Sequence, residues 1–277
     1  MASVRWQFES GELALKDRVE ITVDKHIAEV MLNRPDKFNA LDVDMFHALD
    51  QAARTLAADT SIRAVVLHGS GENFCAGIDV GVLQGGGEEV AKALLASVDG
   101  SPANLAQRAA YAWRELPVPV ICALQGVTYG GGLQIAMGAD LRYAAANTRL
   151  SVMESKWGII PDMAISTTLR NIVPPDRVKE LAWTARIFDA EEALRLGVIT
   201  AIEDDPLGAA RQMAGIIRDR SPDAIQGIKR LVNEAWSLTE DDSLALEATL
   251  QRRLLGSRNQ AEAVRANLEK RSPNFHD

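Results

Sequence analysis

Cysteine and histidine are scarce in this sequence. Its 277 residues include two cysteines, Cys75 and Cys122, and four histidines scattered along the chain. Each cysteine stands inside an apolar stretch, which is typical of a reduced, buried thiol and not of a disulfide framework. No grouping of cysteine, histidine and carboxylate residues has the spacing of metal ligands. We therefore expect neither a disulfide-stabilised protein nor a metal centre.

Long apolar runs and an excess of positive charge are also absent. No stretch of about eighteen apolar residues occurs, as a membrane helix would need, and residues 1–18 alternate charged and apolar side chains. The net charge is −8, so no general basic field would attract nucleic acid or an anionic membrane. The 47% hydrophobic content is enough for a sizeable core. We expect a soluble, untargeted protein of the cytoplasm.

Several common site motifs are missing as well. The sequence has no Walker A loop, no HExxH zinc motif and no GxSxG nucleophile elbow. Gly69 and Gly71 follow an apolar run, as in a dinucleotide-binding GxGxxG, but Phe74 stands where the third glycine belongs. No long helical pattern opens there. We therefore disfavour nicotinamide binding.

The most informative stretch that is present is residues 117–140, PVPVICALQGVTYGGGLQIAMGAD. An apolar run of strand length changes there to a helical pattern at Gly130, Gly131 and Gly132. Glycine permits a sharp turn and lets a ligand approach the main chain. The first amides of the following helix lack intrahelical partners and lie at its positive end, where they favour developing negative charge. A tight turn packed against a neighbouring strand is the structural alternative.

A second stretch has the same character. The apolar residues 64–67 lead into HGSGENFCAGIDV, residues 68–80, which ends in small residues that could expose backbone amides. Two such segments indicate a pair of backbone donors for an oxyanion. In order and spacing, LNRPDKFNAL (32–41), FCAGIDV (74–80) and YGGGLQIAMGADLRYA (129–144) resemble the crotonase superfamily of enoyl-CoA hydratases and isomerases. The resemblance runs nearly end to end.

The periodicity of the chain predicts an α/β protein. A strand hairpin is expected first, followed by a helix that Asp42 caps. The expected strands are residues 19–23, 27–32, 64–67, 118–124, 141–145, 150–153 and 198–202. Helices are expected at residues 88–98, 103–115, 166–172, 176–185 and 190–196, with a glycine loop at 85–87. From residue 206 onward the pattern is helical throughout, so a boundary is placed near residue 205.

The resemblance implies a more specific architecture. It implies a crotonase-like spiral of strand, strand, helix units over residues 1–205. Residues 206–277 would form a helical C-terminal region that packs against neighbouring subunits, as a homotrimer or a dimer of trimers. The substrate would be an acyl-CoA, with coenzyme A as part of the thioester and no tightly bound cofactor. Neither nucleic acid nor a membrane is an expected partner.

The resemblance also implies catalytic residues. It assigns the two oxyanion donors to the amides of Ile78 and Gly131, where they would stabilise the enolate oxygen of a thioester. The usual hydratases carry two glutamates, but this chain has Gln134 at the first position and Glu154 at the second. A glutamine amide can orient water or substrate but does not titrate, so Glu154 is the remaining acid or base of the pair. The structural alternatives are a helix glutamine with a polar partner and a solvated strand-end glutamate.

A further carboxylate, Asp162, follows Glu154 by eight residues. A carboxylate at this position resembles the dienoyl-CoA isomerase branch, where it joins a glutamate in moving protons along a conjugated acyl chain. That branch, however, also has an acid where this chain has Gln134. Asp162 could instead orient a loop or pair with Lys156, and these alternatives stay open.

The resemblance implies that coenzyme A lies against the loop of residues 33–40, against residues 74–76 and against the C-terminal tail. A cation pairs with phosphate and an aromatic face stacks on adenine, although a frayed C-terminus is the alternative for the tail. The residues expected to contact coenzyme A are Arg34, Lys37, Phe38, Ala40, Phe74, Ala76, Lys270, Arg271 and Phe275.

Taken together, these points favour an acyl-CoA enzyme in which Glu154 transfers a proton and a double bond migrates, because isomerisation can use one base. Hydration of a 2-enoyl-CoA by Glu154 and Asp162 is the alternative reaction. A protein that binds acyl-CoA without turnover is the alternative class. An RNA-binding relative is disfavoured, since phosphate contacts need clustered lysine or arginine.

Overall fold

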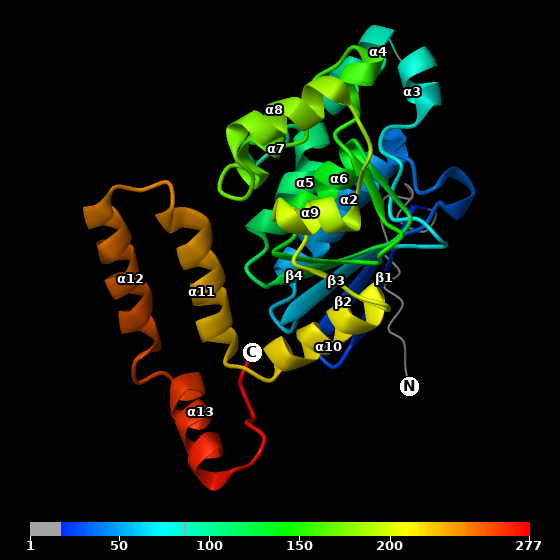
Figure 1. Cartoon of the computed structure of the whole chain (residues 1–277). Helices are drawn as coiled ribbons and strands as arrows, with labels where there is room; N and C mark the ends of the chain where they lie inside the picture. Colours follow the sequence, from blue (N-terminus) through cyan, green and yellow to red (C-terminus); the bar gives the residue numbers. More distant parts are fainter. Residues whose placement is uncertain (1–17, 86) are drawn as a thin grey trace.

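An antiparallel hairpin forms one edge of the main sheet (Figure 1). In the computed structural model, which describes residues 18–85 and 87–277, β1 (Val19–Asp24) pairs with β2 (Ile27–Leu32), as predicted. The sheet continues with β3 (Ala64–Gly69), β4 (Val120–Leu124), β6 (Leu141–Ala144) and β9 (Ala201–Ile202), in that order. From β2 onward, neighbouring strands run parallel. Loops that follow the parallel strands therefore gather at one edge of the sheet.

Helices cover both faces of this sheet. Along β3, Val65 and Leu67 pack in one hydrophobic cluster, and Ala64 and Val66 pack in another, because successive side chains alternate between faces. The first cluster includes α2 (Val43–Ala58) and α5 (Leu105–Glu115), and the second includes α10 (Pro206–Arg218). Burial on both faces explains why β3 and β4 are continuous apolar runs.

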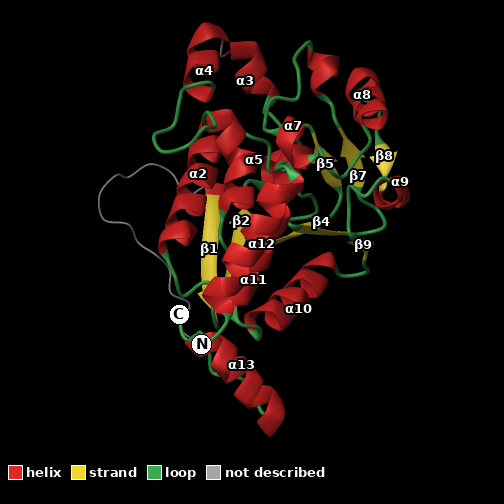
Figure 2. Ribbon diagram, turned by 90° about the vertical axis from the view of Figure 1, so that its left-hand side faces the viewer, coloured by secondary structure: helices red, strands yellow, loops and turns green. Residues whose placement is uncertain are grey.

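A smaller sheet lies next to the main one and leads into the glycine turn. Its strand β5 (Val127–Tyr129) pairs in parallel with β7 (Arg149–Ser151), and β7 pairs antiparallel with β8 (Phe188–Asp189). The chain thus passes from β4 to β5, and so from one sheet to the other, before it reaches α6 (Gly131–Gly138). Figure 2 shows this second sheet beside α8 and α9.

The other helices that precede α10 are short, and they connect the two sheets and the helices that cover them. They are η1 (Pro35–Lys37), α3 (Val80–Gly85), α4 (Gly87–Leu94), η2 (Glu154–Trp157), α7 (Ile165–Thr168), α8 (Pro175–Thr184) and α9 (Ala190–Arg195). The side chain of Asp42 caps α2 by accepting from the amide of Met45, as predicted.

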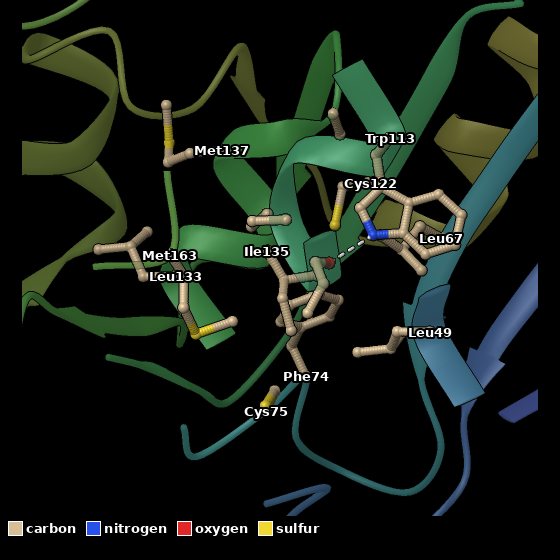
Figure 3. Close-up of a cluster of buried hydrophobic side chains, with 14 of the residues drawn as sticks. Leu49, Leu67, Phe74, Cys75, Trp113, Cys122, Leu133, Ile135, Met137 and Met163 are labelled. Carbon is tan, nitrogen blue, oxygen red and sulfur yellow. Dashed lines mark hydrogen bonds between the residues drawn. The ribbon is translucent and has the colours of Figure 1, made fainter. Parts of the chain in front are cut away.

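The hydrophobic core is formed between the main sheet and the helices α5 and α6 (Figure 3). Trp113 is fully buried there, and its indole N–H donates to the carbonyl of Ala109 (2.9 Å). Phe74 packs in the same cluster. Cys75 and Cys122 are buried free thiols, as predicted, and burial raises the pKa of the Cys75 thiol to about 12.

The last helices, α11 (Pro222–Ala235), α12 (Glu240–Leu254) and α13 (Arg258–Glu269), form what we call the C-terminal arm (Figure 1). The helical region begins at Pro206, where the sequence predicts it, but its first helix α10 covers the sheet. The arm therefore comprises α11 to α13 alone. None of the helices in the described part of the chain is long and apolar enough to cross a membrane.

Some sequence predictions of elements were wrong in detail. The strands β5 and β8 were missed, since strands of three and two residues give no periodic signal. The expected glycine loop is instead the end of α3 and the start of α4, with Gly86 outside the described residues, as are residues 1–17. The helix expected at 166–172 ends at Thr168, and the strand expected at 150–153 ends at Ser151.

Candidate active site

The turn between β5 and α6 requires glycine because the main chain there is crowded. Gly130 caps α6 with φ +50°, in the left-handed region, and a Cβ at Gly132 would lie 2.4 Å from the carbonyl oxygen of Cys75. Because α6 begins at Gly131, the amide of Gly131 lies in the first turn, where an N–H has no intrahelical acceptor. A backbone donor is thus placed at the N-terminus of a buried helix.

The segment of residues 74–80 lies against this turn. Leu41 bridges to it: its amide donates to the carbonyl of Gly77 (2.8 Å), and its carbonyl accepts from the amide of Asp79 (2.9 Å). In such a parallel bridge the N–H and the C=O of Ile78 itself point away from Leu41. A Cβ at Gly77 would lie 3.3 Å from the nitrogen of Gly131, so the two segments touch. Ile78 and Gly131 both line one cavity of about 810 Å³.

Glu154 and Gln134 form a buried pair in the wall of this cavity. The residues are 6% and 1% exposed, respectively. Nε2 of Gln134 donates to Oε1 of Glu154 (2.5 Å), and Oε1 of Gln134 accepts from the amide of Met163 (2.8 Å). Oε2 of Glu154 is buried without a hydrogen-bond partner among residues 18–85 and 87–277. One oxygen of the glutamate is held and the other is free.

Two carboxyl groups share the cavity, and both are weaker acids than usual. Burial raises the pKa of Glu154, because a carboxylate loses its hydration there, and the negative charge of Asp162 raises it further. Backbone hydrogen bonds and the bond from Gln134 act in the opposite direction. Burial also raises the pKa of Asp162, which lines the same cavity. Such shifted carboxyl groups are typical of sites that transfer protons near neutral pH.

Most of the remaining wall is apolar. Its side chains come from α3 and α4, from the helices beneath, and from the segment that follows η2, and they suit a hydrocarbon chain. They are Phe46, Val82, Leu83, Val90, Ala91, Leu94, Leu95, Ala106, Met153, Trp157, Ile159, Ile160 and Met163. None of these residues was predicted from the sequence to belong to the site. The amphipathic pattern of residues 80–95 was the available signal, but it fits a surface helix equally well.

Comparison with known proteins identifies the family. The family model described as Enoyl-CoA hydratase/isomerase matches residues 22–277. The chain belongs to the enoyl-CoA hydratase/isomerase family. The crotonase resemblance predicted from the sequence is therefore confirmed, and the chain is one of a family of enzymes that act on coenzyme A thioesters.

Similar members of the enoyl-CoA hydratase/isomerase family carry out different reactions by name. The 1,2-epoxyphenylacetyl-CoA isomerase of Escherichia coli (strain K12) is 33% identical over 91% of this chain and 96% of its own. The mitochondrial Delta(3,5)-Delta(2,4)-dienoyl-CoA isomerase of Rattus norvegicus is 30% identical over 92% of this chain and 80% of its own. The crystal structure of an enoyl-CoA hydratase from Polaromonas sp. JS666 matches with a TM-score of 0.83 and 29% identity, over 94% of this chain and all of that one. The fold is the crotonase fold, as predicted.

The two segments predicted to bind coenzyme A, residues 33–40 and 74–76, lie against each other. The amide of Ala76 donates to the carbonyl of Phe38 (2.9 Å), so residues 33–40 and 74–76 are neighbours. Ala76 lines the cavity and Phe38 is exposed. Lys37 is exposed and Ala40 is buried.

Two residues expected to contact coenzyme A have other partners in the structure. Arg34 donates to the carbonyl of Ala40 (3.0 Å) within the loop and to Asp79 (2.6 Å), so its charge is paired with the segment of residues 74–80. The Phe74 side chain is fully buried in the core (Figure 3) and does not line the cavity. The motif around Phe74 does not show on which side of the backbone each side chain lies.

The C-terminal tail, which was predicted to contact coenzyme A, lies away from the cavity of its own chain. Figures 1 and 2 show α13 at the opposite end of the molecule from α3 and α4, which line the cavity. Arg271 pairs with Glu262 (2.6 Å), while Phe275 is buried and its carbonyl accepts from Arg63. Lys270 ends α13 in a left-handed conformation. The tail is thus ordered by its own chain and not frayed, and its role toward coenzyme A stays a prediction.

Within residues 18–85 and 87–277, no group of three or more histidine, cysteine, aspartate or glutamate residues could hold a metal ion. Glu154 and Asp162 are the acidic side chains of the cavity wall. The chemistry that the described residues offer is proton transfer and backbone hydrogen bonding.

Proposed function

We propose that this enzyme moves a carbon–carbon double bond along the acyl chain of a coenzyme A thioester, with Glu154 as the residue that transfers the proton. Three features support the proposal: an apolar cavity, two backbone amides at Ile78 and Gly131, and one free buried carboxylate oxygen. By its name, the dienoyl-CoA isomerase of Rattus norvegicus described above shifts double bonds of an acyl-CoA.

The arrangement of Glu154 is the observation that carries the proposal. A Cβ at Gly130 would lie 3.3 Å from Oε1 of Glu154, so the carboxylate lies beside the turn that carries the Gly131 amide. A thioester oxygen bound at that amide would bring the neighbouring carbon, C2, next to Glu154. Oε2, which lacks a partner among the described residues, is then the oxygen free to take the proton.

The proposed reaction is redox neutral and uses one base. Ile78 and Gly131 hydrogen-bond the thioester oxygen of a 3-enoyl-CoA, and each such donor typically contributes about 2.7–4 kcal/mol to transition-state stability. Oε2 of Glu154 takes a proton from C2, and the electron pair of that C–H bond enters a dienolate. C4 then takes the proton back from Glu154. The double bond moves from C3–C4 to C2–C3, and no atom is gained or lost.

Hydration is the second candidate, and the position of Asp162 favours it. Addition of water to a 2-enoyl-CoA uses one group to activate the water and one to protonate C2. Gln134 cannot be the second group, because an amide does not titrate, but Asp162 lines the same cavity as Glu154. Its carboxyl could complete the pair.

Product identification by liquid chromatography coupled to mass spectrometry distinguishes the two reactions, because the retention time separates the 2-enoyl and 3-enoyl isomers, which have equal mass. A 3-enoyl-CoA and a 2-enoyl-CoA of equal chain length are each incubated with the enzyme. Isomerisation converts the first into the second at unchanged mass and leaves the second without added water. Rapid gain of one water by the 2-enoyl-CoA would reject isomerisation in favour of hydration. Absence of any turnover over a range of chain lengths would leave only an acyl-CoA binding protein.

The proposal extends to the assembly and its location. The C-terminal arm exposes apolar side chains over all three helices, which we assign to contacts between copies in a homotrimer or a dimer of trimers. They are Ile228, Val232, Trp236, Leu244 and Val264. Analytical ultracentrifugation tests this, and a monomer at micromolar concentration would reject it. The free buried thiols are consistent with the cytoplasm, which localisation of a fluorescent fusion would test.

A further inference from the structure

We propose that Gln134 is a positioning residue, which holds Glu154 in one orientation relative to the Gly131 amide so that Oε2 alone handles the proton. The inference rests on the proposed function, in which Glu154 is the base. Gln134 then has a positioning role at the place where the usual hydratases carry their first glutamate.

The contacts of Gln134 carry this inference. Both ends of its amide are used: Nε2 donates to Oε1 of Glu154 (2.5 Å), and Oε1 accepts from the amide of Met163 (2.8 Å). One buried side chain of α6 therefore joins η2 to the segment that carries Asp162. These two bonds use one N–H donor and one acceptor lone pair of the amide and fix its orientation.

The same link reaches the proposed oxyanion donor. A Cβ at Gly131 would lie 2.8 Å from Sδ of Met163, so the methionine side chain packs directly on the main chain of Gly131. The base, the amide donor and the Met163 backbone are thus fixed to one another through Gln134. A base must be held within a fraction of an ångström of its productive position, and this network is able to do so.

An amide suits this position better than an acid does. A glutamine donates and accepts at every pH, whereas an ionised glutamate would accept from Met163 but could not donate to Glu154. Two carboxylates in contact would also repel each other, which raises the pKa of one of them. A protonated glutamic acid, by contrast, reproduces both bonds, since its O–H donates and its carbonyl oxygen accepts.

Few other charges face Glu154. Asp162 lies across the same cavity and raises the pKa of Glu154. Lys156, on the same short helix, is exposed and lies over the ring of Trp157. The helix α8 packs on η2, and its Glu180 is paired with Arg186 (2.6 Å). Removal of the Gln134 donor should therefore have a clear effect on the titration of Glu154.

The first experiment replaces Gln134 by methionine, which keeps the length of the side chain and removes both hydrogen bonds. We expect turnover of the proposed substrate to fall by about 10- to 100-fold, as for the loss of a hydrogen bond to a charged group, with a smaller change in KM. The acidic limb of the pH–rate profile should move to higher pH, because the bond from Gln134 lowers the pKa of Glu154. Gln212→Met, an exposed substitution on α10, is the control and should leave the profile unchanged.

The second experiment uses Gln134→Glu as a conditional rescue. While the new carboxyl is protonated and Glu154 is ionised, both bonds are restored, so activity should exceed that of Gln134→Met in the pH range between the two pKa values of the pair. As the pH rises and the new carboxyl ionises, activity should fall. Activity that instead rises across the whole pH range, together with new hydration of a 2-enoyl-CoA, would overturn the positioning role and make position 134 a site of acid or base catalysis.

A third measurement separates this inference from the proposed function. The carbonyl stretch of protonated Glu154, identified by difference infrared spectra against Glu154→Gln, is titrated without any substrate. If it titrates at higher pH in Gln134→Met while no acyl-CoA is turned over, the positioning contact stands and the proposed function fails. If Gln134→Met only lowers stability and changes neither this titration nor the pH–rate profile, the positioning role is refuted.

Discussion

Glu154 combines burial with one free oxygen, and the two features together predict its behaviour on substitution. Glu154→Gln keeps the shape of the side chain and removes the base. General base catalysis typically contributes about 10²–10⁴-fold, so turnover of acyl-CoA should fall by an amount in that range while KM changes little. Glu191→Gln, at an exposed position on α9, is the matched control. Equal activity of the two variants would refute the assignment of Glu154.

The same glutamate should make the protein less stable as the pH rises. Its pKa is raised in the folded state, so the folded protein holds this proton over a range in which the unfolded chain has lost it. Stability from this group is present below the ordinary glutamate pKa and is lost as the pH rises through the raised value. Urea unfolding should find Glu154→Gln more stable than the unmodified protein above neutral pH, with a difference that shrinks in acid. A difference independent of pH would contradict the account.

Sequence reasoning at the residue scale depended on motifs. The resemblance located Glu154, Gln134 and Asp162, and the structure brings all three to one cavity. It could not show that Gln134 bonds to Glu154, because that contact joins residues twenty apart through the packing of α6 against η2. Nor could it show that Phe74 turns inward.

At the scale of elements, the N-terminus of α6 controls the site through its close approach to the chain at Cys75. Gly132→Ala would place a Cβ 2.4 Å from the Cys75 carbonyl oxygen, so the start of the helix must shift. We expect a loss of about 1–3 kcal/mol in the free energy of unfolding and a large loss of turnover. Gly215→Ala in α10 is the control, because no atom lies within 4 Å of its added Cβ, and it should stabilise by about 0.5–1 kcal/mol. Similar behaviour of the two variants would contradict this.

A second element-scale prediction concerns the attachment of α11 to the body. The buried ammonium of Lys229 donates to the carbonyls of Trp113 and Val118 and to Asp140 (2.8 Å). Lys229→Met removes this donor from the two carbonyls and leaves the amide of Val120 (2.7 Å) as a donor to Asp140, which should cost about 1–3 kcal/mol in urea unfolding. Lys179→Met, at an exposed position on α8, should cost much less. Equal losses would mean that Lys229 does not fasten the arm.

The elements that sequence patterns predicted well are those long enough to show a full period of apolar and polar residues. The hairpin β1–β2, the buried strands β3 and β4 and the capped helix α2 each have enough residues to show their periodicity. β5 and β8 exist only because β7 lies between them, so their cause is tertiary pairing. The apolar residues of α3 and α4 have a helical pattern, but only the fold turns them toward the cavity.

At the scale of the whole molecule, the chain crosses from one sheet to the other between β4 and β5, and the cavity lies at the glycine turn that follows β5. Parallel pairing brings the ends of β3 and β4 together, so the segments that follow them, residues 74–80 and the glycine turn, become neighbours. In the proposed function, these two segments hold a thioester oxygen between them.

A structure with a bound acyl-CoA tests that claim most directly. We predict that the thioester oxygen lies about 2.7–3.1 Å from the amide nitrogens of both Ile78 and Gly131, with C2 beside Oε2 of Glu154. A carbonyl beyond hydrogen-bond reach of both amides, or an acyl chain outside the cavity that Glu154 and Asp162 share, would contradict the account.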